Sequence, residues 1–328
     1  MDANIQTNDW LENELNPKVS YAGQFAILIG LVLGGAIVAA LIQLGVLMSI
    51  TDLKTLMSGD TDKLMALMAL PQNNNKVMLM QVLGTLVMMA IPAFLFAKIV
   101  SKNSINYLGF NHKINHFQIL LVIVIAIVGL FLSGGLGELN KLIPVSNSLK
   151  IKFEKLEDDY EKQVMIFSNM KTIGDYVISL IMIAILPAIF EELLFRGALQ
   201  KLLIDWFKTP HIAIIVTSIL FSLVHFSFYG FLPRMMLGMV LGYLFFYGKS
   251  IWLNILMHFI NNGVAITAMY FAIKNNQSAT EAMKDGFPIW VLIIVLPAMV
   301  GLLLAYKRIC ENLSTKKTVY DTINGIGK

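Results

Sequence analysis

The residues of this chain that could do chemistry lie inside apolar stretches. Glu191 and Glu192 follow directly on the run IMIAILPAIF, and Arg196 lies four residues after Glu192. His225 ends the run FSLVH, and His258 opens the sequence HFINN. An ionisable side chain near the middle of a spanning helix costs about 2.5–3.5 kcal/mol on insertion scales, so such groups pair with one another or line a polar cavity that serves a function. The pattern predicts a polar site inside the membrane.

Helix geometry separates the two glutamates. Residues four apart share a helix face, so Glu192 should pair with Arg196 and neutralise it. Glu191 points about 100° away and keeps no fixed cation, which makes it the candidate general base. Pro187 removes one backbone hydrogen bond from the same stretch and predicts a kink that opens polar access.

The two histidines are expected near Glu191. Glu191 lies seventeen residues before Lys208 and His225 lies seventeen after it, so a turn at Lys208 places both at a similar depth in an antiparallel hairpin. They could then share one water molecule. His258 and Asn262 are four residues apart, and this pair suits either the stabilisation of an oxyanion or the binding of a metal.

Composition identifies the elements that must position these groups. The 328 residues are 57% hydrophobic and only 14% charged, which exceeds what a soluble core of this length can bury. The mean hydropathy is +0.70. We predict an all-α fold, a polytopic membrane helical bundle of about eight transmembrane helices. They are expected near residues 23–50, 77–100, 116–134, 174–194, 211–228, 233–247, 251–273 and 287–306.

The predicted organisation has four parts. An N-terminal tail and three transmembrane helices occupy residues 1–134, an amphipathic connector 135–173, a catalytic four-helix core 174–273, and a last helix with a basic tail 274–328. The connector is interpreted either as a helix on the lipid headgroups or as a flap that gates substrate access.

The ends of the chain bear on its location. The first 22 residues are polar and acidic without a cleavage signal, so we expect the first span to stay as an anchor. Basic residues behind the last span, including Lys307, Arg308, Lys316 and Lys317, favour cytoplasmic termini. The net charge of +4 is modest, and no nucleic-acid partner is expected.

Three motifs in this order, Glu191-Glu192-x-x-x-Arg196, Phe221-x-x-x-His225 and His258-x-x-x-Asn262, resemble those of the CPBP intramembrane proteases. That family includes prenyl-protein (CAAX) endopeptidases and bacteriocin-processing or bacteriocin-immunity proteins. The resemblance covers about residues 174–273.

The resemblance implies a peptidase. Glu191 and His225 would activate a water, His258 and Asn262 would bind the oxyanion, and Glu192 and Arg196 would support the site. It also implies a peptide or lipidated-protein substrate among membrane lipids. No cofactor is required in this interpretation.

Three alternatives stay open. One is a zinc-dependent protease that binds the metal through Glu191, His225 and His258. Another is a non-catalytic immunity or scaffold protein of the same fold. The third is a transporter with a polar lining, although the sequence shows no inverted repeat.

Overall fold

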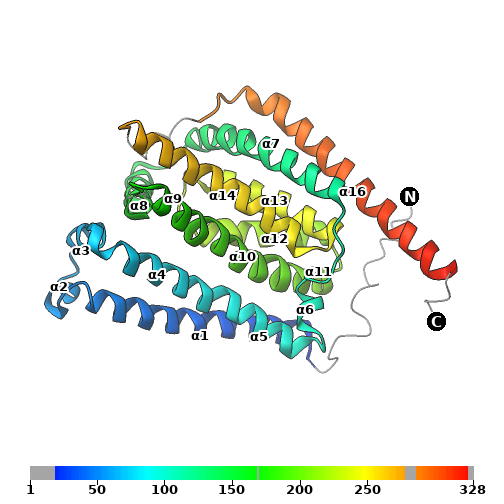
Figure 1. The fold of residues 1–328 in the computed structure, drawn as a ribbon, viewed down its shortest axis with the longest axis horizontal. Coiled ribbons are helices and arrows are strands. Elements are labelled where there is room, and N and C mark those ends of the chain that lie inside the picture. Colours follow the sequence, from blue (N-terminus) through cyan, green and yellow to red (C-terminus); the bar gives the residue numbers. More distant parts are fainter. Residues whose placement is uncertain (1–18, 168–169, 278–285, 324–328) are drawn as a thin grey trace.

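The computed structural model describes residues 19–167, 170–277 and 286–323. Within these ranges every regular element is a helix, and the long helices lie side by side in one bundle (Figure 1). The predicted all-α membrane bundle is therefore confirmed. Most of the predicted acidic tail, residues 1–18, and the side chains of Lys316 and Lys317 lie outside the described part of the chain.

Seven helical segments in the described residues are long and apolar enough to cross a membrane. They are α1 (Tyr21–Met48), the continuous segment Pro71–Val100, α7 (His116–Lys141), the continuous segment Ile173–Phe207, α13 (Phe231–Gly248), α14 (Ile251–Lys274) and the part Val291–Leu313 of α16 (Val291–Ile323). The segment Pro71–Val100 comprises η1 (Pro71–Asn73), α4 (Asn74–Thr85), η2 (Leu86–Ala90) and α5 (Ile91–Val100). The shorter helices α2 (Leu53–Met57), α3 (Thr61–Met68) and α6 (Ser104–Tyr107) lie between these segments.

The remaining predicted span is shorter than expected. Helix α12 (Pro210–Leu223) has 14 residues, about 21 Å at 1.5 Å per residue, which is less than a hydrocarbon core of about 30 Å. The prediction that this helix reaches residue 228 is wrong. The chain leaves the helix after Leu223 and turns, and Phe226 adopts a left-handed φ of 51°. His225 is therefore a loop residue.

The helix that carries the glutamates is interrupted by π-helical turns. It comprises α9 (Ile173–Ser179), η3 (Leu180–Ile185), α10 (Leu186–Glu192), η4 (Leu193–Gln200) and α11 (Lys201–Phe207). The π-helical η3 ends immediately before α10, where Pro187 cannot donate a backbone hydrogen bond. The π-helical η4 begins directly after Glu192. The helix continues beyond the predicted span of 174–194 and ends at Phe207, at the predicted turn, where Lys208 is left-handed with a φ of 55°.

Two glycines bring α13 close to α12. A Cβ on Gly238 would lie 3.1 Å from the Cα of Ser218, and one on Gly242 would lie 2.7 Å from a methyl group of Ile214. The spacing G-x-x-x-G places both glycines on one helix face, as in close membrane helix pairs. This contact fixes α13 beside the end of α12 from which His225 emerges.

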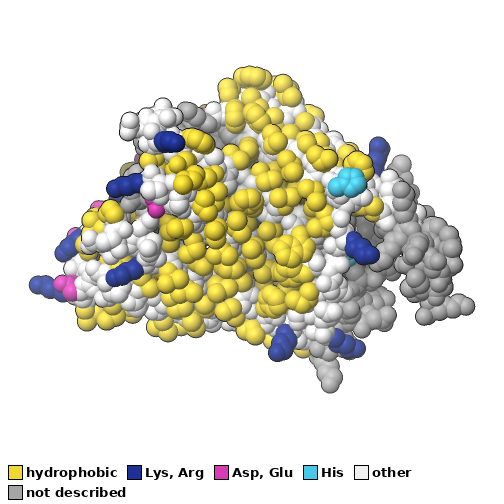
Figure 2. Space-filling view, viewed as in Figure 1, with side chains coloured by type: hydrophobic (Ala, Val, Ile, Leu, Met, Phe, Trp, Pro, Cys, Tyr) yellow, Lys and Arg dark blue, Asp and Glu magenta, His cyan; other side chains and the backbone are white. Residues whose placement is uncertain are grey.

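The surface agrees with a membrane setting. Figure 2 shows hydrophobic side chains across the middle of the visible face, with charged side chains toward its two ends. On α1, Leu33 and Ile37 are 60% and 65% exposed, as residues that face lipid would be. Helix α1 begins and α16 ends at the same end of the bundle (Figure 1).

The predicted connector is largely one helix. Helix α7 extends to Lys141, beyond the predicted boundary at residue 134, and α8 (Asn147–Phe167) follows. Helix α8 crosses the end of the bundle opposite the start of α1 (Figure 1). Among its apolar residues at helical spacing, Phe153 and Tyr160 are half-buried, whereas Leu156 is exposed.

Candidate active site

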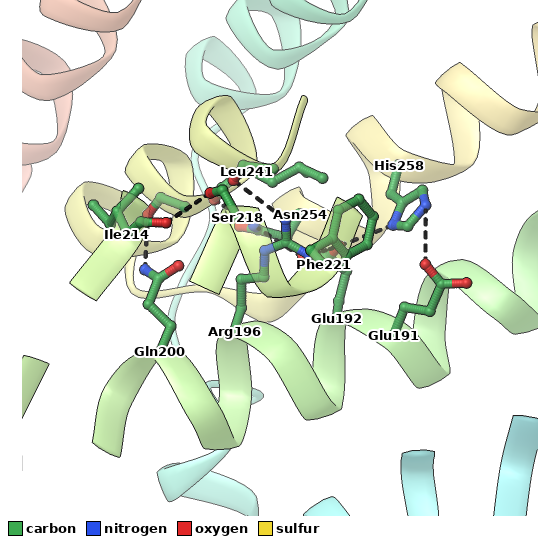
Figure 3. Close-up of polar contacts among 12 residues, drawn as sticks. Glu191, Glu192, Arg196, Gln200, Ile214, Ser218, Phe221, Leu241, Asn254 and His258 are labelled. Atoms are coloured by element: carbon green, nitrogen blue, oxygen red, sulfur yellow. Dashed lines mark hydrogen bonds and ion pairs between the residues drawn. The ribbon is translucent and has the colours of Figure 1, made fainter. Parts of the chain in front are cut away.

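Glu192 and Arg196 form an ion pair in the core of the bundle. Both side chains are completely buried, and Nη1 of Arg196 donates to Oε1 of Glu192 at 2.8 Å. This confirms the predicted pairing. Nη2 of Arg196 also donates to the Gly238 carbonyl of α13 at 3.2 Å, and the guanidinium carbon lies 4.6 Å from the centre of the Phe221 ring. Arg196 therefore ties α12 and α13 to the helix of the glutamates (Figure 3).

Glu192 also binds two residues of α14. Nδ1 of His258 lies 2.8 Å from Oε1 of Glu192, and Nδ2 of Asn254 donates to Oε2 at 3.2 Å. The same Asn254 amide donates to the Leu241 carbonyl of α13 at 2.7 Å. A buried charge is tolerated when it is paired and its lone pairs are satisfied. Glu192 meets both conditions, so its carboxylate is held in one position.

Glu191 is placed differently. Its side chain is 13% exposed, and its Oε2 lies 3.7 Å from Nε2 of His258. That oxygen has no hydrogen-bond partner among the described residues. Figure 3 shows Glu191 directed at the edge of the His258 ring opposite Glu192. The sequence interpretation that Glu192 takes the arginine while Glu191 stays available agrees with this geometry.

His225 approaches the same region from the loop after α12. Its Nδ1 lies 2.8 Å from the Phe221 carbonyl, and because a carbonyl only accepts, Nδ1 must carry the proton. The Phe221 ring lies 5.1 Å from the His225 ring and 5.8 Å from the His258 ring. His258 in turn lies beside Glu191. The structure thus brings Glu191, His225 and His258 into one region.

Asn262 is less closely connected. It lies four residues after His258 on α14, and its Oδ1 is 3.4 Å from Nδ2 of Asn261. Helix α14 places Asn262 one turn after His258, as predicted. Among the described residues, its side-chain amide is hydrogen-bonded only to that of Asn261. The role predicted for it as an oxyanion donor stays a prediction.

The described residues contain no cluster of side chains that would serve the zinc alternative. Among the described residues, no three His, Cys, Asp or Glu side chains are grouped so that they could hold a metal ion. Glu191 lies near His258, and the Phe221 ring lies beside both His225 and His258, but these three suggested ligands are not such a group.

Several supporting residues were missed or only partly predicted. Asn254, which donates to Glu192, is not among the site residues predicted from the sequence. Gln200, one helical turn beyond Arg196, donates to the Gly242 carbonyl at 2.9 Å, as Arg196 does to that of Gly238. The G-x-x-x-G spacing of the two glycines matches the four-residue spacing of the two donors, and this was the signal in the sequence.

Comparison with known proteins agrees with this arrangement. Residues 173–264 match the family model "Type II CAAX prenyl endopeptidase Rce1-like", and this segment contains all three motifs. Comparisons with the curated proteins and with the solved structures found no match. Together with the seven long apolar helices, the match describes an integral membrane protein with multiple spans. The resemblance predicted from the motifs is confirmed over residues 173–264, which are similar to the Rce1-like type II CAAX prenyl endopeptidases.

Proposed function

We propose that the protein is an intramembrane endopeptidase that hydrolyses a peptide bond near the membrane surface with a water activated by Glu191 and His225. The observation that carries the proposal is the contrast between the two glutamates. Glu192 is fully engaged by Arg196, His258 and Asn254, whereas Oε2 of Glu191 is buried without a hydrogen-bond partner in the described residues. A general base needs a free lone pair within reach of the water it deprotonates.

His225 can share this task. With the Nδ1 proton donated to the Phe221 carbonyl, the neutral ring keeps a lone pair on Nε2. In the proposed reaction, a water between Glu191 and His225 loses one proton to one of them. Its oxygen attacks the carbonyl carbon of the peptide, and the proton is then given to the leaving amine nitrogen as the C–N bond breaks.

His258 is proposed as the oxyanion donor. Because Glu192 is paired with Arg196 and accepts hydrogen bonds only, Nδ1 of His258 donates to it. Nε2 can then donate to an oxyanion when the ring carries both protons. Asn262 would supply a second donor once substrate is bound. A buried, preorganised donor of this kind contributes about 10²–10³-fold to the rate of acyl transfer.

We propose a prenylated protein or peptide with a C-terminal CAAX sequence as the substrate, because the matched family is described as acting on it. The reaction as proposed needs no metal. The start of α1 and the end of α16 share one end of the bundle, and Lys307 and Arg308 lie on α16, so we also propose that both termini are cytoplasmic.

The test uses the full-length protein in lipid vesicles with a farnesylated peptide that ends in a CAAX sequence. Mass spectrometry should detect cleavage by the wild type and none by Glu191→Gln or His225→Ala. The same peptide without the farnesyl group tests whether the lipid is recognised. A scaffold or immunity protein would leave both peptides intact, and its biological effect would survive both substitutions.

A further inference from the structure

The loop that carries His225 is held by residues outside the segment that matches the family. The loop runs from Val224 to Gly230, between α12 and α13. The first anchor is Asn140, a completely buried residue near the end of α7. Its Nδ2 donates to the Phe228 carbonyl at 2.8 Å, and its Oδ1 accepts from the Leu232 backbone N–H at 3.2 Å. One side chain thus clamps the loop to the beginning of α13.

The second anchor is one face of α8. Glu157 accepts a hydrogen bond from Oγ of Ser227 at 2.8 Å. The Phe153 ring stacks on that of Phe228, with centroids 4.1 Å apart and planes inclined by 1°. One turn beyond Glu157, the Tyr160 ring lies 4.8 Å from the guanidinium carbon of Arg234. Positions 153, 157 and 160 share a helix face, so α8 meets the loop and the start of α13 along one continuous stripe.

The loop itself supplies a reason for these anchors. Phe226, directly after His225, adopts a left-handed backbone with a φ of 51°. A bulky residue in this conformation is strained and persists only when the surroundings determine it. The Phe226 side chain is 74% exposed, so it offers little packing of its own. Ser227 is the point where the strained loop is tied down, because its Oγ donates to Glu157 and accepts from the Gly230 N–H at 3.1 Å.

We propose that Asn140 and Glu157 are positioning residues for His225: they fix the loop so that the imidazole faces Glu191. The inference rests on the proposed function of His225. Both residues act through the loop, and neither belongs to the cluster of Glu191, Glu192, Arg196 and His258. A displacement of about 1 Å in a reacting group can lower a rate by about 10²-fold. The charged helix α8 is therefore part of the catalytic framework.

The first test compares Asn140→Ala and Glu157→Ala with matched controls in vesicles, with the farnesylated CAAX peptide as substrate. Asn73→Ala is the control for Asn140, since Asn73 is also buried and donates to a backbone carbonyl, that of Leu67 at 2.9 Å. Glu154→Ala is the control for Glu157, since Glu154 lies on α8 and pairs only with Lys150 at 3.8 Å among the described contacts. We expect kcat to fall about 10- to 100-fold in the two test variants, with KM and both controls within about twofold of wild type.

A second readout does not depend on activity. Diethyl pyrocarbonate acylates accessible imidazole nitrogens, and mass spectrometry can follow His225 and His258 separately in one protein. We expect His225 to react several-fold faster in Asn140→Ala and Glu157→Ala than in wild type, while His258 changes little because Glu192 still holds it. Ser227→Ala should reproduce the effect of Glu157→Ala, and the double variant should add nothing further.

The outcomes separate this inference from the proposed function. Unchanged kcat and unchanged His225 reactivity in both test variants would overturn the inference while leaving the peptidase intact. An equal loss in Asn73→Ala would also overturn it, since the effect would then be one of general stability. If wild type cleaves neither peptide, the proposed function fails, and positioning of the loop is judged on His225 reactivity alone.

Discussion

His258 joins the two adjacent glutamates through its two ring nitrogens: Nδ1 lies 2.8 Å from Glu192 Oε1, whereas Nε2 lies 3.7 Å from Glu191 Oε2. Glu192 fixes the orientation of the ring, and Arg196 fixes Glu192. The ring edge that faces Glu191 is therefore held in place by a network that does not itself need to meet the substrate. Because Glu192 holds the His258 ring while Glu191 faces its free edge, substitutions of these two adjacent glutamates should have different effects.

Glu191→Gln should lower turnover strongly and leave the fold intact. The amide keeps the shape of the side chain but cannot take a proton, so kcat should fall about 10²–10⁴-fold, the usual contribution of a general base. The melting temperature in detergent should stay close to that of wild type, because Oε2 makes no hydrogen bond among the described residues that could be lost. A variant with full activity would exclude Glu191 as the base.

Glu192→Gln should reduce both activity and stability. An amide at this position leaves the buried Arg196 guanidinium without its counter-charge, and breaking a buried pair costs roughly 3–5 kcal/mol of folding free energy. Denaturant unfolding would measure this loss. The double variant E192L/R196M should recover part of the stability, because neither charge then remains unpaired, but it should stay inactive, because His258 loses its acceptor. Equal instability of the single and double variants would contradict this account.

The sequence predicted most of what local geometry determines. The spacing of Glu192 and Arg196 predicted their ion pair because residues four apart on a helix share a face. Glu191 and His225 are equally far from the turn at Lys208 in the sequence, and this spacing predicted that they lie in one region. The apolar runs predicted the long helices, since a bilayer requires about 20 apolar residues per span.

Features that depend on contacts between distant segments could not be predicted in this way. Helix α12 ends at Leu223, short of the predicted residue 228, and the following loop is tied to α7 and α8 instead. The apolar spacing of α8 does not identify the face that meets the bundle, because Glu157 contacts the loop while Leu156 is exposed. In the same way, the bond between Asn254 and Glu192 depends on how α14 packs against α10.

Cleavage of the farnesylated peptide should survive strong chelation. The proposed mechanism uses only side chains, and the described residues contain no group of three potential metal-ligating side chains. Activity of purified protein would be measured before and after dialysis against a chelator, together with its zinc content. Retained activity with substoichiometric zinc agrees with the prediction. Loss of activity that added zinc restores would favour the metal-dependent alternative.

Gly238→Ala should impair the site without touching any of its ionisable groups. The added methyl group would meet the Ser218 backbone at 3.1 Å, which pushes α13 away from α12, and the Gly238 carbonyl that accepts from Arg196 would move with it. We expect a lower melting temperature and a fall in kcat. Gly301→Ala on α16 is the matched control, since its methyl group would meet nothing within 4 Å and alanine favours a helix over glycine by about 1 kcal/mol. The control should therefore be as stable as wild type or more so. If Gly238→Ala behaves like Gly301→Ala in both measurements, the close contact between α12 and α13 does not support the position of Arg196.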